Sequence, residues 1–341
     1  MQPRPLPVPV PIPADVFEAE DRVRPFAIET PLLRSDALDA AAGASVWIKP
    51  ECLQVTGSFK IRGASNRLSK LSETERARGV VAYSSGNHAQ GVARAARQLG
   101  MLATIVMPSD APLVKVEGVR SDGADIVFYD RWHESREDIA ADICDQTGAT
   151  LVPSYDDADI IAGQGTAGLE FARQMQAAGE PLHHLVCCVG GGGLISGIAL
   201  AFSALSPDTR IWGSEPEHHD DWARSLESGA IVANSKEAPS SICDAILTPQ
   251  PGDVTWAVGG SRLAGGFRVS DADVASAMRF AFRHLKLVVE PGGAAALAAL
   301  LHRMPESSRG QRLGIVLTGG NVDPALFARL IAPSGPDQGP G

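Results

Sequence analysis

The sequence lacks the signatures of several large classes of protein. Its five cysteines stand at irregular intervals that match neither a disulfide framework nor a pair of Cys-x-x-Cys zinc ligands. Acidic residues outnumber basic ones, the net charge is −10, and no basic stripe marks a surface for nucleic acid. No apolar run free of charge and glycine approaches the length that spans a membrane. We therefore expect a protein of the reducing cytoplasm that binds neither nucleic acid nor a membrane.

Proline is concentrated at the N-terminus. Residues 1–13 alternate Pro with apolar side chains, and they lack the uninterrupted apolar core and the small-residue cleavage site of a secretory signal. They predict an extended polyproline-like arm that is disordered or laid against the body or a partner subunit. Residues 331–341 are rich in Pro and Gly and predict a flexible tail. Because so little sequence follows Asp323, we expect no C-terminal regulatory domain.

Short apolar stretches and amphipathic stretches alternate along the rest of the chain. Strands are expected at residues 46–50, 79–83, 103–107, 125–129, 150–152, 184–189, 210–215 and 314–317. Several segments between them show the apolar spacing of helices. This alternation predicts βαβ units and parallel sheets. A chain of 341 residues is long enough for two domains, or for one large domain with a smaller one inserted.

Four glycines connect an expected buried strand to an expected helix, and they are Gly190, Gly191, Gly192 and Gly193. Their backbone N–H groups can converge on an anion, and the helix N-terminus adds partial positive charge, which suits a phosphate. The run is not Gly-x-Gly-x-x-Gly, which argues against a dinucleotide, and it lacks the Gly-Lys-Ser/Thr ending of a P-loop. A tight turn without a ligand is the alternative.

Two other polar motifs follow expected strands. The run from Ser84 to His88 combines hydroxyls, an amide and the start of a helix, which together could hold a carboxylate. Thr318 ends the last strand beside two glycines, and its hydroxyl could bond the edge of a flat ring. Helix capping and a turn are the alternatives.

Lys60 lies in the stretch Thr56-Gly57-Ser58-Phe59-Lys60-Ile61-Arg62-Gly63, between an aromatic residue and the start of an expected helix. A lysine can form a Schiff base with a carbonyl compound when its surroundings lower its pKa. This stretch alone favours an ordinary lysine at the start of a helix, and the other motifs give it its weight.

Taken together, the motifs resemble a family of pyridoxal-phosphate enzymes. They occur in the order and rough spacing of the serine/threonine dehydratase–serine racemase group, at Ser58–Gly63, Ser84–Gly91, Gly190–Gly193 and Thr318–Asp323. This group has the fold of the tryptophan synthase β subunit, fold type II. The resemblance implies an α/β fold of two domains, each a mostly parallel sheet flanked by helices, with the cofactor in the cleft between them. Residues 14–75 and 155–330 would form the large domain, and residues 76–154 the small one.

The resemblance implies that Lys60 holds pyridoxal phosphate as a Schiff base and then removes the Cα proton of the substrate. Phe59 would pack against the cofactor ring, and Asn87 would bond its phenolic oxygen. The four glycines and Leu194 would bind the phosphate, and Thr318 would meet the pyridine nitrogen. A hydroxyl holds a proton on that nitrogen less firmly than a carboxylate does, which suits elimination of a β-hydroxyl better than transamination.

The resemblance also implies that Ser84, Ser85, Asn87 and His88 receive the substrate carboxylate. Ser85 stands where the racemases of the group carry a serine opposite the lysine, so it could return a proton to Cα and allow racemisation. Arg136 matches an arginine near the racemase active site and could contact a polar or acidic side group of the substrate. A solvated helix arginine is the alternative.

A cation site is implied as well. Glu215 and Asp221 match carboxylate ligands of the group, and His219 stands at a position that supplies a backbone carbonyl. Oxygen ligands of this kind favour Mg²⁺ or a similar cation. The adjacent His218 and His219 are poorly spaced to share a zinc ion on a helix. The group carries a small residue at position 219, so the chain departs from the pattern there.

The sequence therefore predicts a threonine/serine dehydratase, an ammonia-lyase that converts a β-hydroxy amino acid into a 2-oxo acid and ammonia, acting as a homodimer or a dimer of dimers. A serine racemase, a 3-hydroxyaspartate dehydratase and the dehydratase of hydroxyectoine breakdown are alternatives. A carrier or regulatory protein that binds pyridoxal phosphate without turnover is an alternative of another class. One methyl group in a pocket is worth only about 1–3 kcal/mol, so the motifs do not select the substrate.

Overall fold

The computed structural model describes residues 9–84, 86–111 and 113–332. Most of the predicted N-terminal arm and C-terminal tail lies outside these ranges, as does Ser85. Helix α1 (Pro13–Val23) begins at the last residue of the predicted arm. Helix α14 (Pro324–Ile331) ends at the first residue of the predicted tail.

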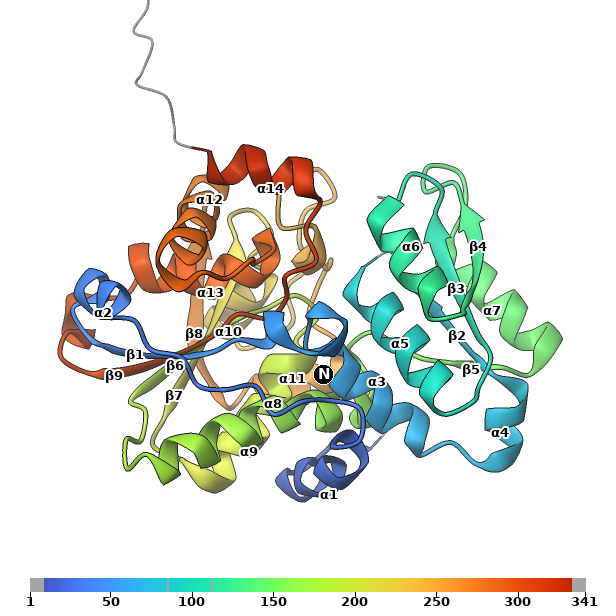
Figure 1. Ribbon diagram of the computed structural model, residues 1–341, viewed down its shortest axis with the longest axis horizontal. Coiled ribbons are helices and arrows are strands. Elements are labelled where there is room, and N and C mark those ends of the chain that lie inside the picture. Colours follow the sequence, from blue (N-terminus) through green and yellow to red (C-terminus); the bar gives the residue numbers. More distant parts are fainter. Residues whose placement is uncertain (1–8, 85, 112, 333–341) are drawn as a thin grey trace, which may run out of the picture.

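The described chain forms two parallel β-sheets, one in each half of Figure 1. The larger sheet has five strands in the order β1 (Ser45–Lys49), β9 (Arg312–Val316), β6 (His184–Cys188), β7 (Arg210–Pro216) and β8 (Leu263–Val269). The smaller has four in the order β4 (Asp125–Tyr129), β3 (Ala103–Pro108), β2 (Val80–Tyr83) and β5 (Thr150–Leu151). All pairings within the sheets are parallel, which confirms the predicted α/β fold. The domain limits at residues 76 and 154 stay a prediction.

Helices cover both sheets (Figure 1). Around the smaller sheet lie α4 (Glu73–Arg78), α5 (Asn87–Gln98), α6 (Leu113–Ser121) and α7 (Arg136–Thr147). The remaining helices are α2 (Asp36–Ala42), α3 (Lys60–Ser69), α8 (Ala158–Ala177), α9 (Gly193–Leu205), α10 (Asp221–Ser228), α11 (Asp253–Gly259), α12 (Asp271–Phe280) and α13 (Pro291–His302). Polar residues fix several N-termini; the Asp157 carboxylate, for example, accepts hydrogen bonds from the first turn of α8. None of the described helices is long and apolar enough to cross a bilayer.

Strand β6 shows why the larger sheet needs helices on both faces. Val186 and Cys188 pack into a cluster with residues of α13, whereas Leu185 and Cys187 pack into another with residues of α8 and α9. Successive side chains of a strand point to opposite faces, so an entirely apolar strand must be covered twice. The sequence analysis missed β8, because Gly265 and Gly266 interrupt its apolar run.

Helices α3, α8 and α9 meet at a glycine seam, which we define as Gly63, Gly163, Gly165 and Gly197. A Cβ atom added to Gly163 would lie 2.5 Å from the Arg62 carbonyl oxygen and 2.9 Å from the Cα atom of Gly63. One added to Gly165 would lie 2.8 Å from the carbonyl oxygen of Gly197. The three helix backbones therefore touch without side chains between them. This contact fixes the start of α3 relative to the start of α9.

Candidate active site

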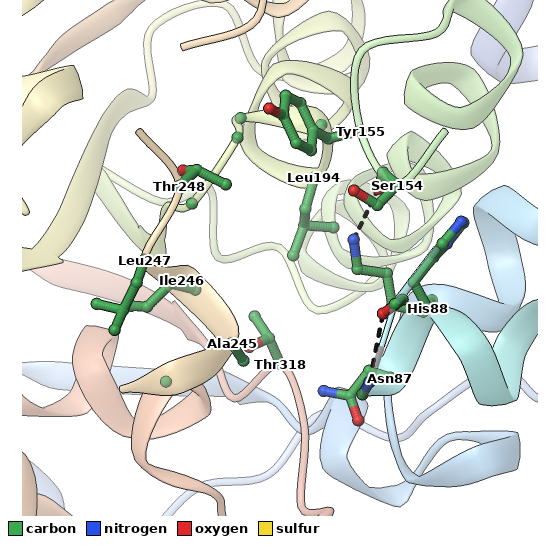
Figure 2. A pocket seen from close by; sticks show the side chains of 18 of the residues that line it. Asn87, His88, Ser154, Tyr155, Leu194, Ala245, Ile246, Leu247, Thr248 and Thr318 are labelled. Carbon is green, nitrogen blue, oxygen red and sulfur yellow. Dashed lines mark hydrogen bonds between the residues drawn. The ribbon is translucent and has the colours of Figure 1, made fainter. Parts of the chain in front are cut away.

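A cavity of about 400 Å³ is lined by residues from both sheets. Its walls include the segments that follow β2, β6 and β9, at the carboxyl ends where parallel sheets bind ligands. Figure 2 shows the segment from Ala245 to Thr248 along one wall and Asn87, His88 and Ser154 on the facing side. The structure brings the predicted lysine, glycine loop, Asn87 and Thr318 together around this one cavity.

Lys60 is the first residue of α3 and lines the cavity. Its Nζ atom donates a hydrogen bond to the carbonyl oxygen of Ser154 at 2.7 Å and lies 5.2 Å from the centre of the Phe59 ring. Burial lowers the pKa of Lys60 to about 8, although Cys188 and Glu290 act in the opposite direction. A substantial share of the neutral amine, the form that attacks a carbonyl carbon, is therefore present near neutral pH.

The four glycines form the turn that leads from β6 into the N-terminus of α9. Gly192 has a φ of 95°, a conformation that side chains disfavour. A Cβ atom at Gly191 would overlap the Tyr155 ring, and one at Gly192 would overlap the Trp222 ring. The loop therefore has room for backbone only. Its N–H groups and the helix terminus supply positive potential for an anion.

Thr318 lies beneath the same cavity and has a neighbour that the sequence analysis did not single out. The Sγ atom of Cys188 lies 3.1 Å from the Oγ1 atom of Thr318, within hydrogen-bonding distance. Both residues are buried and line the cavity. The only signal in the sequence was the position of Cys188 at the end of the strand that precedes the glycine loop.

Asn87, the first residue of α5, is held on both sides of its amide group. Its Nδ2 atom donates to the Oε1 atom of Glu290 at 2.5 Å, and its Oδ1 atom accepts a hydrogen bond from Asn321 at 2.8 Å. Burial raises the pKa of Glu290 to about 7. Glu290 was not among the site residues predicted from the sequence. These contacts fix the direction in which Asn87 faces the cavity.

The segment predicted to receive a carboxylate is partly described. Ser84, Asn87 and His88 line the cavity, whereas Ser85 lies outside the described residues. The Nε2 atom of His88 lies 2.9 Å from the carbonyl oxygen of Val152, and burial lowers the pKa of His88 to about 3. The ring is therefore neutral and donates through Nε2 to that carbonyl. Positive potential for a carboxylate must come from backbone N–H groups at the start of α5 and from nearby cations.

Arg136 is the first residue of α7, and it lines the cavity while its side chain remains 47% exposed. Its guanidinium carbon lies 5.3 Å from the centre of the Tyr83 ring, and its Nε atom lies 2.9 Å from Glu137. A guanidinium group stays protonated in proteins. The cavity therefore contains a permanent cation besides Lys60.

The predicted cation ligands lie apart from this cavity. Both oxygens of Glu215 accept backbone N–H bonds at the start of α10, from Trp222 at 3.0 Å and Ala223 at 2.8 Å. The Oδ2 atom of Asp221 is buried and has no hydrogen-bond partner among the described residues. The imidazole of His219 instead faces the carbonyl oxygen of Pro239 at 2.9 Å. The part of the chain that the structure describes contains no cluster of three or more His, Cys, Asp or Glu side chains suited to a metal.

Known proteins share the sequence pattern and the fold of this chain. A family model for pyridoxal-phosphate dependent enzymes matches residues 23–319. The chain belongs to this family. L-threo-3-hydroxyaspartate ammonia-lyase of Pseudomonas sp is 49% identical over 93% of this chain and 97% of its own length. The structure of maize serine racemase matches with a TM-score of 0.88 and 36% identity, covering 94% of this chain and 97% of the maize chain. A threonine deaminase from T.th. matches with a TM-score of 0.86 and 42% identity over 92% and 99% of the two chains.

The family assignment confirms several predictions. The protein is an enzyme of fold type II, its cofactor is pyridoxal phosphate, and its relatives are ammonia-lyases and racemases. The carrier without turnover is therefore not retained. The structure fits the cofactor: a buried lysine of lowered pKa, a loop with room for backbone only at a helix N-terminus, and a buried threonine hydroxyl surround one cavity. The individual roles of these residues, and the dimer, stay predictions.

Proposed function

We propose that the protein is a 3-hydroxyaspartate ammonia-lyase, which releases ammonia from 3-hydroxyaspartate and yields a four-carbon 2-oxo dicarboxylic acid. The observation that carries this proposal is Arg136 in the wall of the cavity. Threonine and serine have one carboxylate, and the start of α5 provides a place for it. Their uncharged side groups would give the half-exposed guanidinium group, whose partner in the chain is Glu137, no charged partner in the substrate, whereas a β-carboxylate would supply one.

The Pseudomonas relative, whose name gives L-threo-3-hydroxyaspartate as its substrate, supports the same choice over nearly the full chain. The proposal therefore takes up an alternative from the sequence analysis in place of threonine or serine. The predicted general chemistry, elimination of a β-hydroxyl with release of ammonia, is unchanged. Ser85, the residue predicted to allow racemisation, lies outside the described residues.

Pyridoxal phosphate, when bound, supplies the electron sink that makes the Cα proton of an amino acid removable. Lys60 is the residue that takes this proton, because its amine is buried in the cavity and its lowered pKa leaves it partly neutral. The amide of Asn87 and the hydroxyl of Thr318, which line the same cavity, would hold the cofactor ring. The carboxylates of the substrate are bound at the start of α5 and at Arg136, which leaves the β-hydroxyl free to depart.

A substrate panel tests the proposal. Purified enzyme loaded with pyridoxal phosphate is given the threo and erythro isomers of 3-hydroxyaspartate, L-serine and L-threonine, and both ammonia and 2-oxo acid are measured. We expect kcat/KM for one 3-hydroxyaspartate isomer to exceed that for serine and threonine by about tenfold or more, the typical worth of a hydrogen bond to a charged group. A larger kcat/KM for threonine or serine contradicts the proposal.

The Arg136→Met variant locates the preference. It should reduce kcat/KM for 3-hydroxyaspartate by about 10- to 100-fold, with a smaller effect on serine, because only the first substrate loses a charged partner. Arg136→Lys keeps the charge and should retain part of the preference. Lys60→Ala is the control for the chemistry, since it should abolish turnover of every substrate and the absorption of lysine-bound cofactor. Retained turnover in Lys60→Ala contradicts the assignment of the site.

A further inference from the structure

An ion pair crosses the active-site cavity at its mouth. Lys115 belongs to α6, which covers the smaller sheet, and Asp244 begins a short helical turn, η3 (Asp244–Ile246), in the part of the chain that contains the larger sheet. The Nζ atom of Lys115 lies 2.7 Å from the Oδ2 atom of Asp244. Both residues line the cavity that contains Lys60. In Figure 2 the adjacent Ala245 marks the wall that faces Asn87 and His88.

The two partners of this ion pair have different environments. The Lys115 side chain is 11% exposed, whereas the Asp244 side chain is 60% exposed. The carboxylate can therefore return to water at little cost, while the ammonium group stays largely within the protein and needs an anion beside it. This asymmetry makes Asp244 the replaceable partner.

Lys115 also lies next to the segment that receives the substrate. Its Nζ atom is 3.9 Å from the point where a Cβ atom of Gly86 would stand, between Ser84 and Asn87. A substrate whose one carboxylate binds at the start of α5 is therefore close enough to Lys115 for a second carboxylate on the same short chain to reach its ammonium group. Glu290 lines the same cavity as Lys115 and Asp244, which places the pair at the same site.

The other charged groups of the cavity are less suited to exchange. Arg136 is paired with Glu137, its immediate neighbour in the same helix, so a substrate that binds at Arg136 breaks no contact between separate walls. Asp156 accepts backbone N–H bonds from Val254 and Thr255 and is committed to the first turn of α11. Among the described ion pairs of the cavity, Lys115 and Asp244 are the ones that join separate walls.

We propose that Lys115 is a further specificity-determining residue, which binds the second substrate carboxylate together with Arg136, and that Asp244 occupies the position of this carboxylate until the substrate arrives. The distal carboxylate of a dicarboxylic substrate displaces the Asp244 carboxylate from the Lys115 ammonium group. The inference rests on the proposed function, because it assigns a binding group for the dicarboxylic substrate class. When such a substrate binds, the contact between Lys115 and Asp244 is lost, and a contact between Lys115 and the substrate replaces it.

Two ligands that are not turned over isolate this interaction. Succinate and butyrate have the same four-carbon chain and differ only in the distal carboxylate. Their dissociation constants are measured by calorimetry on enzyme loaded with pyridoxal phosphate, and the ratio of the two affinities is compared among variants. Each variant is first checked for the absorption spectrum of the bound cofactor.

The expected changes have opposite signs for the two partners. Asp244→Asn should increase the preference for succinate over butyrate by about three- to tenfold, because it removes a competing carboxylate from Lys115. Lys115→Met should reduce that preference by about tenfold or more, and Lys115→Arg should retain most of it. In the double variant Asp244→Asn should have no further effect, since its influence acts through Lys115.

Three results would overturn the inference. One is an unchanged succinate preference in Asp244→Asn. Another is an equal loss of succinate and butyrate binding in Lys115→Met, which would assign Lys115 to the first carboxylate. The third is an Asp244→Asn effect that persists without Lys115. If Lys115→Met does not retain cofactor, Asp244→Asn and Lys115→Arg decide the matter. Because these ligands are not substrates, the substrate panel can fail while this result stands, and the reverse also holds.

Discussion

Two groups of buried carboxylates differ in how the protein neutralises them. The first is the α3 ion cluster, which we define as Lys49, Glu51, Arg62 and Glu170. Arg62 lies 2.7 Å from Glu51 and 2.7 Å from Glu170, and Lys49 lies 2.8 Å from Glu170. Burial opposes ionisation of Glu51, but Arg62 holds its pKa below the usual value. Two cations and two anions therefore balance one another at α3, the helix that carries both Lys60 and Arg62.

The second group is the acid pair, Glu215 and Asp221. Burial raises the pKa of Asp221 to about 7, and burial together with Asp221 raises the pKa of Glu215 well above its usual value. The hydrogen bonds to these carboxylates come from backbone N–H groups and from Asn234, which are uncharged. The difference is instructive. Buried charges that are balanced within the chain contribute to the fold, whereas buried charge that is left unbalanced requires a proton or a cation from outside.

Removing the central cation of the α3 ion cluster should have the largest effect on the free energy of unfolding. Arg62→Leu leaves Glu51 and Glu170 buried without their main partner, and we expect a loss of about 3–5 kcal/mol in the free energy of unfolding. Urea denaturation measures this loss. Arg24→Leu is the control, because Arg24 and its partner Asp21 are 69% and 82% exposed; its effect should stay within about 1 kcal/mol. Equal effects of the two substitutions would remove the distinction between buried and surface charge.

Glu290 applies the same rule at the active-site cavity. Its pKa is raised from 4.5 to about 7, so the folded protein keeps a proton on it that the unfolded chain releases between these pH values. Stability is therefore lost as pH rises through this window, and the loss is complete above pH 7. Relative to Glu290→Gln, the cofactor-free wild type should lose about 3 kcal/mol between pH 4.5 and 8, at about 1.4 kcal/mol per pKa unit.

Thermal or urea unfolding of both proteins across this pH range measures the difference. Glutamine keeps an oxygen that can accept the Asn87 hydrogen bond, so the comparison isolates the charge. Parallel pH profiles for the wild type and Glu290→Gln would contradict the assignment of a raised pKa.

Substitution of Asp221 should change the free energy of unfolding least, and it should increase it. At pH 8 without divalent cations, Asp221→Asn should stabilise the protein by about 1–2 kcal/mol, because it removes one of two neighbouring buried like charges. Added Mg²⁺ should raise the Tm of the wild type and leave that of Asp221→Asn unchanged, since a ligand stabilises only the state that binds it. Glu217→Gln, at an exposed carboxylate in the same segment, is the control. Equal responses to Mg²⁺ in all three proteins would exclude a cation at the acid pair.

The sequence predicted those features that local patterns encode. Alternating apolar and amphipathic stretches predicted the parallel sheets, and glycines after a strand predicted the loop at the start of α9. The partners found only in the structure come from distant parts of the chain. Glu290 is 203 residues from Asn87, and Asp244 is 129 residues from Lys115. No periodicity or spacing signals such pairs, because packing of the two sheets brings them together. Strand β8 was missed for the opposite reason, since its glycines hide a local pattern.

The glycine seam has a consequence for how this enzyme can change. Because α3, α8 and α9 touch backbone to backbone, Lys60 and the glycine loop at the start of α9 keep a fixed separation, and any side chain added at Gly163 or Gly165 would force them apart. Variation that alters the substrate must therefore occur on the facing walls, in α6, α7 and the segment that begins at Asp244. The glycine seam therefore keeps one side of the cavity constant, and new substrate specificity can arise on the other side.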